Sequence, residues 1–130
     1  MDIGRYSPNA VMLMKEPGTM QHSEFVPNDP VLVEIVQRLV EAFHPERLYL
    51  FGSKARGQTT PDSDYDLFMV LERLEAPRYR LEQQAHSLLW ELGTAADIVV
   101  WPREDFEGRL HLAASLPATV VREGILLYAA

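Results

Sequence analysis

Residues 48–67 read LYLFGSKARGQTTPDSDYDL, and the rest of the fold can be worked out from this stretch. Leu48–Phe51 is a short apolar run that ends at a glycine, which is typical of a buried strand. Gly52 and Ser53 then turn the chain into a short helix, and a polar segment leads to a second strand at 64–71. The stretch therefore predicts a strand–helix–loop–strand unit.

Helices and strands alternate on both sides of this unit. Apolar residues at helical spacing follow Pro30 and stop at Pro45, which predicts a helix that Asn28 or Asp29 caps. Further periodic segments predict helices at 78–92, after Pro102 and at 116–123, and strands at 97–101 and 125–128. The order α-β-α-β-α-β-α-β indicates an α/β (α+β) fold, a single domain with a mixed β-sheet flanked by helices.

Composition limits the classes of function. The 130 residues include 12 Lys+Arg and 19 Asp+Glu, a net charge of −7, so we expect no direct nucleic-acid binding through charge alone. Apolar runs are too short for a membrane span, and the lack of cysteine is compatible with a cytoplasmic protein. Four prolines in the first 30 residues and no clear period predict an irregular N-terminal arm at 1–29, followed by one domain at 30–130.

Three aspartates are the candidate metal ligands. Asp64 and Asp66 are two residues apart on a predicted strand and project from the same face, and Asp97 lies on the next strand. Two carboxylates ~4 Å apart repel each other by about 4 kcal/mol at an effective dielectric constant of ~20, unless a cation or a raised pKa relieves them. Oxygen ligands favour Mg²⁺. The alternative is a turn cap at Asp64 and a solvent-facing Asp66.

The turn upstream is a candidate phosphate site. Gly52 and Ser53 lie where a strand leads into a helix, a geometry that presents backbone N–H groups to an anion. Arg56 adds charge for phosphate oxygens, although an ion pair with one of the aspartates is equally open. Residues 52–57 match half of a P-loop, but the lysine of that motif is absent from the next positions.

Taken together, these motifs resemble a known family. Residues 52–57 (GSKARG), a spacer to Ser63, and 64–67 (DYDL) resemble the signature of the DNA polymerase beta-like nucleotidyltransferase superfamily, and Asp97 matches its third carboxylate. The short GSKARG segment is similar to that of the minimal nucleotidyltransferases (MNT proteins). The resemblance in element order covers residues 31–128.

The resemblance implies an enzymatic role for each matched residue. Gly52 and Ser53, with Arg56 beside them, would hold the triphosphate of ATP. Asp64 and Asp66 would bind two Mg²⁺ ions, while Asp97 would complete the second metal site and help to deprotonate the attacking hydroxyl. The implied reaction is transfer of AMP with release of pyrophosphate.

Minimal nucleotidyltransferases are often antitoxins paired with HEPN-domain RNase toxins, and those studied transfer AMP to a tyrosine of the toxin. The resemblance therefore implies a protein adenylyltransferase (AMPylation) and a HEPN toxin partner. Because the chain has no length for an acceptor-binding domain, we expect the acceptor surface to come from a partner or a second copy. Two alternatives stay open: an antitoxin that only binds its toxin, and a small-molecule, aminoglycoside-type nucleotidyltransferase.

Other residues are assigned structural roles. The four histidines show no metal-ligand spacing. Trp90 and Trp101 are expected to be core or interface anchors, and Tyr49 and Tyr65 to pack beside the site. The C-terminal strand at 125–128 is a candidate exposed edge.

Overall fold

The computed structural model describes residues 29–57 and 64–130. Within them the chain forms a four-stranded mixed sheet in the order β3-β2-β1-β4. The strands are β1 (Arg47–Phe51), β2 (Tyr65–Leu71), β3 (Ala96–Pro102) and β4 (Ile125–Ala129). The helices are α3 (Pro30–Phe43), α4 (Gly52–Ala55), α5 (Arg78–Leu89, continued by the 3₁₀ turn Trp90–Leu92), α6 (Arg103–Gly108) and α7 (Leu116–Glu123). The predicted fold class is confirmed.

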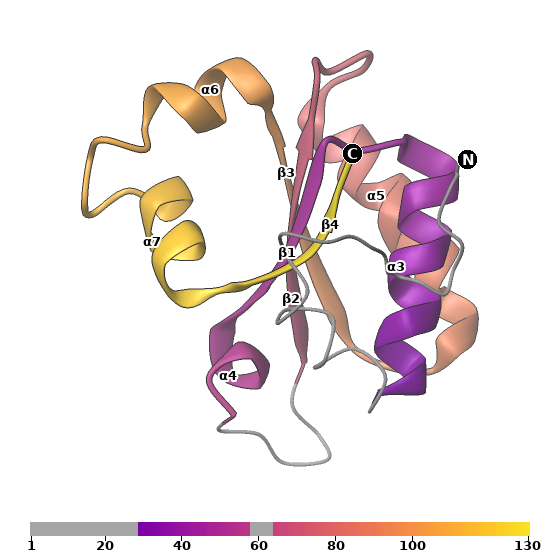
Figure 1. Cartoon of the computed structure of the whole chain (residues 1–130). Helices are drawn as coiled ribbons and strands as arrows, with labels where there is room; N and C mark the ends of the chain where they lie inside the picture. The colour runs from indigo at the N-terminus through magenta and orange to yellow at the C-terminus, as the bar shows by residue number, and fades with distance from the viewer. Residues whose placement is uncertain (1–28, 58–63) are drawn as a thin grey trace.

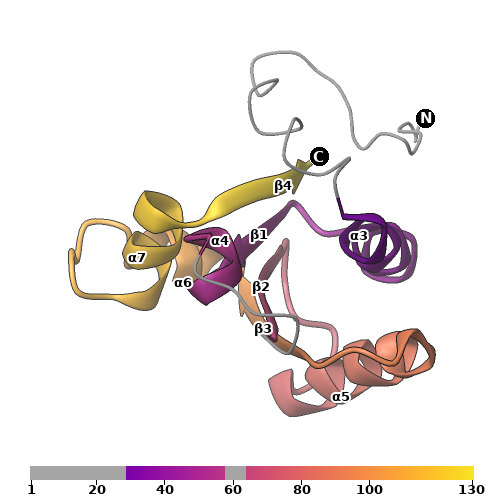
Figure 2. The same ribbon diagram turned by 90° about the horizontal axis from the view of Figure 1, so that it is seen from below.

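The sheet lies between two layers of helices. β1 pairs with β2 and with β4 in antiparallel fashion, whereas β2 and β3 are parallel and are joined through α5. A parallel pair requires such a crossover because the chain must return to the same end of the sheet. Helices α3 and α5 cover one face, and α6 and α7 lie on the other (Figure 1). Seen from below, α4 lies at the end of the sheet where β1 ends (Figure 2).

Strand β2 alternates between the two cores, as its sequence predicts. Tyr65, Leu67 and Met69 belong to the larger core under α3 and α5. Phe68 belongs to the smaller core on the α6 side, and Asp66 shares its face by the two-residue period. The predicted start of this strand is wrong: β2 begins at Tyr65, so Asp64 lies just before the strand rather than in it.

Helix α3 begins as its sequence predicts. Of the two candidate caps, Asp29 is the N-cap: its carboxylate accepts a hydrogen bond from the Leu32 N–H at 3.1 Å. Pro30 occupies the first turn, where its missing N–H costs nothing. The arm predicted for residues 1–29 lies outside the described residues apart from Asp29.

The smaller core is aromatic. The Trp101 ring stacks on Phe68 with centroids 5.8 Å apart, and the guanidinium groups of Arg78 and Arg109 lie 5.3 and 5.6 Å from the Trp101 centroid. Trp101 is therefore a packing residue, as expected.

Trp90 is not a core residue, which was one of the two roles expected from the sequence. Its side chain is 84% exposed, because the buried positions of α5 are Leu81, Ala85 and Leu89. The α-helix also ends at Leu89, three residues before the predicted end.

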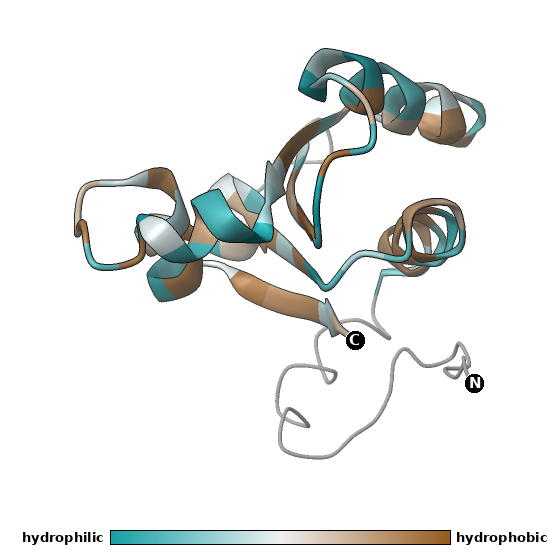
Figure 3. Ribbon diagram, turned by 90° about the horizontal axis from the view of Figure 1, so that it is seen from above, coloured by the Kyte–Doolittle hydropathy of each residue, from teal (hydrophilic) through white to brown (hydrophobic). Residues whose placement is uncertain are grey.

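The two edges of the sheet are formed by β4 and β3, which differ in what surrounds them. β4 is at one edge of the sheet, as the sequence suggested, and β3 is at the other. In Figure 3, β4 is hydrophobic along most of its length, whereas α5 presents hydrophilic turns to the surface. Over residues 29–57 and 64–130, no helix is long and apolar enough to cross a membrane.

Candidate active site

Two of the predicted aspartates are direct neighbours in the sheet. Asp66 and Asp97 are register partners in the parallel pairing of β2 with β3, so their backbones lie one strand spacing apart, about 4.8 Å. Both carboxylates are near the start of their strands, at the end of the sheet where α4 lies (Figure 1). Asp66 is half-buried and Asp97 is exposed. Asp64 is exposed and lies directly before the first residue of β2.

The three carboxylates interact electrostatically. The pKa of Asp66 is raised, first because burial disfavours the charged form and then because of the charges of Asp97 and Asp64. The charge of Arg56 acts in the opposite direction and lowers the pKa of Asp66. The charge of Arg56 thus acts on Asp66, which is compatible with both of the roles that its sequence left open, an ion pair with an aspartate and contact with phosphate.

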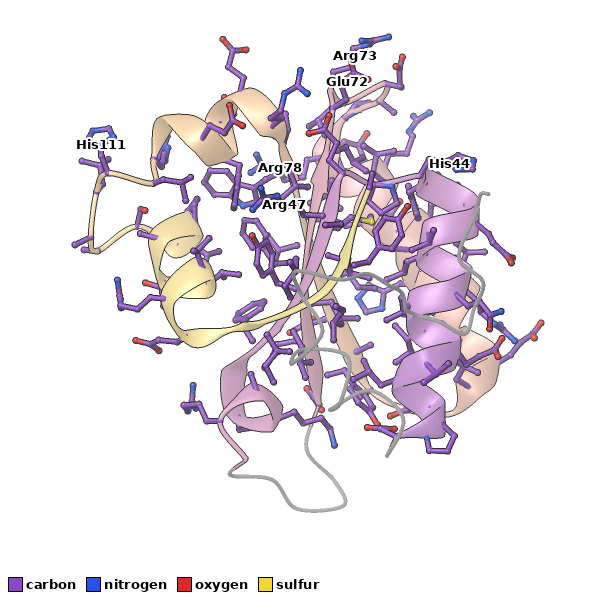
Figure 4. The ribbon with its side chains drawn as sticks, viewed as in Figure 1. His44, Arg47, Glu72, Arg73, Arg78 and His111 are labelled. Atoms are coloured by element: carbon purple, nitrogen blue, oxygen red, sulfur yellow. The ribbon has the colours of Figure 1, made fainter. Side chains whose placement is uncertain are left out.

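The donor set suits a hard divalent cation. In the described part of the chain, no group of three or more His, Cys, Asp or Glu side chains is already arranged as a metal site. The available donors are nevertheless carboxylate oxygens that repel one another, which is the chemistry that Mg²⁺ satisfies. Two of the histidines are elsewhere: Figure 4 shows His44 at the end of α3 and His111 between α6 and α7, on opposite sides of the molecule.

Gly52 allows Asp66 to approach the turn before α4. Its φ angle is +76°, a left-handed conformation that side chains disfavour. A Cβ atom added to Gly52 would overlap Oδ2 of Asp66 and would lie 3.0 Å from its Cγ. Ser53 follows in the first turn of α4 and is half-buried. The turn predicted as a phosphate site is therefore packed directly against a candidate metal ligand.

A contact that sequence patterns do not reveal holds this end of β2 in place. The Tyr65 hydroxyl donates to the Asp29 carboxylate, with oxygen–oxygen distances of 2.8 and 3.0 Å. Nζ of Lys54 lies 4.4 Å from the Tyr65 ring centroid. Burial, followed by the hydrogen bond and charge of Asp29, raises the pKa of Tyr65 to about 12. Tyr65 is thus a packing residue that ties α3 to the segment carrying the aspartates.

Replacing Gly52 with alanine should displace Asp66. We expect the positive φ angle alone to cost Gly52→Ala about 1–2 kcal/mol in the free energy of unfolding. Gly57→Ala is a matched control, because Gly57 has a φ angle of +75° and nothing within 4 Å of the added Cβ. Denaturant unfolding should show a larger loss for Gly52→Ala. Equal losses would contradict the close packing of Gly52 against Asp66.

Replacing Tyr65 with phenylalanine removes a hydrogen bond to a carboxylate. We expect Tyr65→Phe to lower the free energy of unfolding by about 1–3 kcal/mol at neutral pH. Because the folded-state pKa is raised from 10.0 to about 12, this contribution is complete below pH 10 and disappears as the pH rises to about 12. Denaturation at several pH values checks the trend, with the exposed Tyr79→Phe as control. A difference that does not change with pH would refute the assignment.

Comparison with solved structures identifies several similar proteins. A protein from Sulfolobus solfataricus assigned as a nucleotidyltransferase has a crystal structure with a TM-score of 0.54 and 20% identity, covering 90% of this chain and 92% of that one, so the two share a fold. A crystal structure of a toxin–antitoxin with AMP-PNP is 24% identical over 75% of this chain and 73% of that one, with a TM-score of 0.48. A protein assigned as a minimal nucleotidyltransferase is 29% identical over 73% and 90%, with a TM-score of 0.44.

The family itself is shown by sequence. A search of curated proteins found no match. The profile of the nucleotidyltransferase domain family, however, matches residues 31–126, from the first described helix to the last strand. This match spans most of the chain and confirms the resemblance seen in residues 52–67. The chain belongs to the nucleotidyltransferase domain family.

Proposed function

We propose that this chain transfers AMP from ATP to a hydroxyl group of a protein, and that the acceptor is a HEPN-type RNase toxin for which the chain is the antitoxin. The observation that carries the catalytic part is the register pairing of Asp66 with Asp97 beside Gly52. Burial, together with the charges of Asp97 and Asp64, raises the pKa of Asp66, an arrangement that the stability of the fold does not require.

The aspartates would hold the metal ions. Asp64 and Asp66 would bind two Mg²⁺ ions, and Asp97 would complete the second site. Bound there, the cations would supply positive charge to the triphosphate and to the reacting oxygens. Their presence would also remove the repulsion that the metal-free carboxylates experience.

The remaining roles belong to the chain's own groups. Gly52 and Ser53 would cradle the triphosphate, with Arg56 beside it. Asp97, the exposed member of the register pair, would accept the proton of the acceptor hydroxyl. The acceptor oxygen would then form a bond to the α-phosphorus while the bond to the bridging oxygen breaks, and pyrophosphate leaves.

The choice of partner rests on resemblance. Residues 52–57 are similar to the corresponding segment of minimal nucleotidyltransferases, which are often paired with HEPN-domain toxins. Such a pair would act in the cytoplasm, where ATP and RNA are both available. The surface charge is consistent with a protein partner, because a net charge of −7 disfavours non-specific binding to a nucleic-acid backbone.

Labelled ATP tests the proposal. The chain is mixed with Mg²⁺, the purified protein encoded beside it, and ATP labelled on either the α- or the γ-phosphate. We expect label on the partner from the α-phosphate and none from the γ-phosphate. The double variant Asp64→Asn/Asp66→Asn should lose at least about a thousandfold in rate, because both metal ligands lose their charge, and should keep its fold by circular dichroism.

Three results would contradict the proposal or a part of it. Undiminished transfer by the folded double variant would refute the metal-ligand assignment. A stable complex with the partner but no label would instead favour an antitoxin that acts by binding alone. Label on an added aminoglycoside, and none on protein, would favour the small-molecule alternative.

A further inference from the structure

A surface groove beside α5 leads to Asp97. Its volume is about 640 Å³. It is lined from α5 by Tyr79, Glu82, Gln83, His86 and Ser87, and from β3 by Asp97 and Ile98. Since β3 is an outer strand of the sheet, no further strand covers this side of Asp97 in the described part of the chain. The groove therefore approaches the candidate active site from the side opposite Asp66.

The wall of the groove is held in a fixed position. Oε2 of Glu82 accepts a hydrogen bond from the Val100 N–H at 3.0 Å, which joins α5 to the outer edge of β3. Backbone groups alternate direction along a strand, so the Ile98 N–H points to the same open edge as that of Val100. Leu81 and Ala85 are buried on the inner face of α5. The exposed face of α5 therefore has a defined position relative to Asp97.

That exposed face carries two large aromatic side chains. Tyr79, Gln83 and His86 are spaced at i, i+4 and i+7, which places them on one face of α5, and Trp90 follows at i+11 in the 3₁₀ turn that continues the helix. All four are exposed, and the exposed fractions of Tyr79 and Trp90 are 59% and 84%. We call these four residues the α5 stripe. Exposed tyrosine and tryptophan are enriched at protein–protein interfaces, where they supply much of the binding energy.

The charge of the groove distinguishes between classes of acceptor. The residues that line it include Glu82 and Asp97 but neither lysine nor arginine. A nucleic-acid strand would bring phosphates against these carboxylates with no cation to offset them. A polypeptide has no such backbone charge, and the open edge of β3 offers it hydrogen-bonding groups.

We infer that the α5 stripe and the adjoining groove form the docking surface for the protein acceptor. The acceptor packs on Tyr79 and Trp90, and a segment of it enters the groove, so that its hydroxyl group reaches Asp97. The inference rests on the proposed function. The inference adds to the proposed function the surface of the chain that selects the acceptor. It also states that this surface binds a protein and not a nucleic acid.

Three variants test the docking surface. Tyr79→Ala and Trp90→Ala remove the exposed anchors, and Ser87→Trp fills the groove. Leu112→Ala is the control, because Leu112 is 48% exposed and lies outside the α5 stripe. The measurements are the affinity for the purified protein encoded beside this chain, the rate of AMP transfer to it, and the affinity for ATP.

Each α5 variant should weaken the complex at least about tenfold, as loss of an interface anchor does. The KM for the acceptor should rise similarly, while ATP affinity stays within about twofold of wild type and the control variant is unchanged. Trp90 also reports directly: its fluorescence emission should shift to shorter wavelength when the acceptor binds, and Trp90→Phe should remove the shift.

The outcomes separate this inference from the proposed function. Wild-type transfer with unimpaired α5 variants would overturn the docking surface and leave AMP transfer standing. A wild-type complex that forms without transfer, and is weakened by the α5 variants, would support the surface and overturn the reaction. If the variants dissociate a dimer of this chain without affecting transfer, the stripe is a homodimer interface and the inference is overturned.

Discussion

The parallel pairing of β2 with β3 places Asp66 opposite Asp97, and the rest of the site depends on that register. A shift of one residue would move either side chain to the other face of the sheet. Several contacts hold the register: α5 carries the chain from one strand to the next, Glu82 binds the outer edge of β3, and Tyr65 is anchored by the N-cap of α3. The apolar cores on both faces thus position a pair of like charges.

The placement of Asp66 beside the other carboxylates lowers the stability of the metal-free protein. Burial and two neighbouring carboxylates raise the pKa of Asp66, so its charged form is disfavoured in the folded protein. Sites of this kind are commonly functional, because nothing in folding alone would favour them. Gly52 also serves the site rather than the fold. Its positive φ angle and missing side chain leave room for the Asp66 carboxylate beside the turn.

Much of the architecture could be predicted from the sequence because it depends on local patterns. Helical spacing after Pro30, the two-residue period of β2 and the glycine turn at 52 are all local signals. The contact between Tyr65 and Asp29 could not be predicted, because it joins residues 36 positions apart. Nor could the exposure of Trp90, since an apolar residue near the end of a helix can face either way. The spacing of Asp64 and Asp66 predicted a pair of repelling carboxylates, and the family resemblance assigned the role of each aspartate. The structure adds the register of Asp66 with Asp97.

Thermal unfolding with and without Mg²⁺ tests the central claim, that Asp66 belongs to a carboxylate group built for a cation. Because its folded-state pKa is raised, a charged Asp66 lowers stability at neutral pH, and Asp66→Asn should raise the Tm of the metal-free protein. Saturating Mg²⁺ should raise the Tm of the wild type and have little effect on the variant. An equal response of the two proteins to Mg²⁺, or a lower metal-free Tm for Asp66→Asn, would contradict the account.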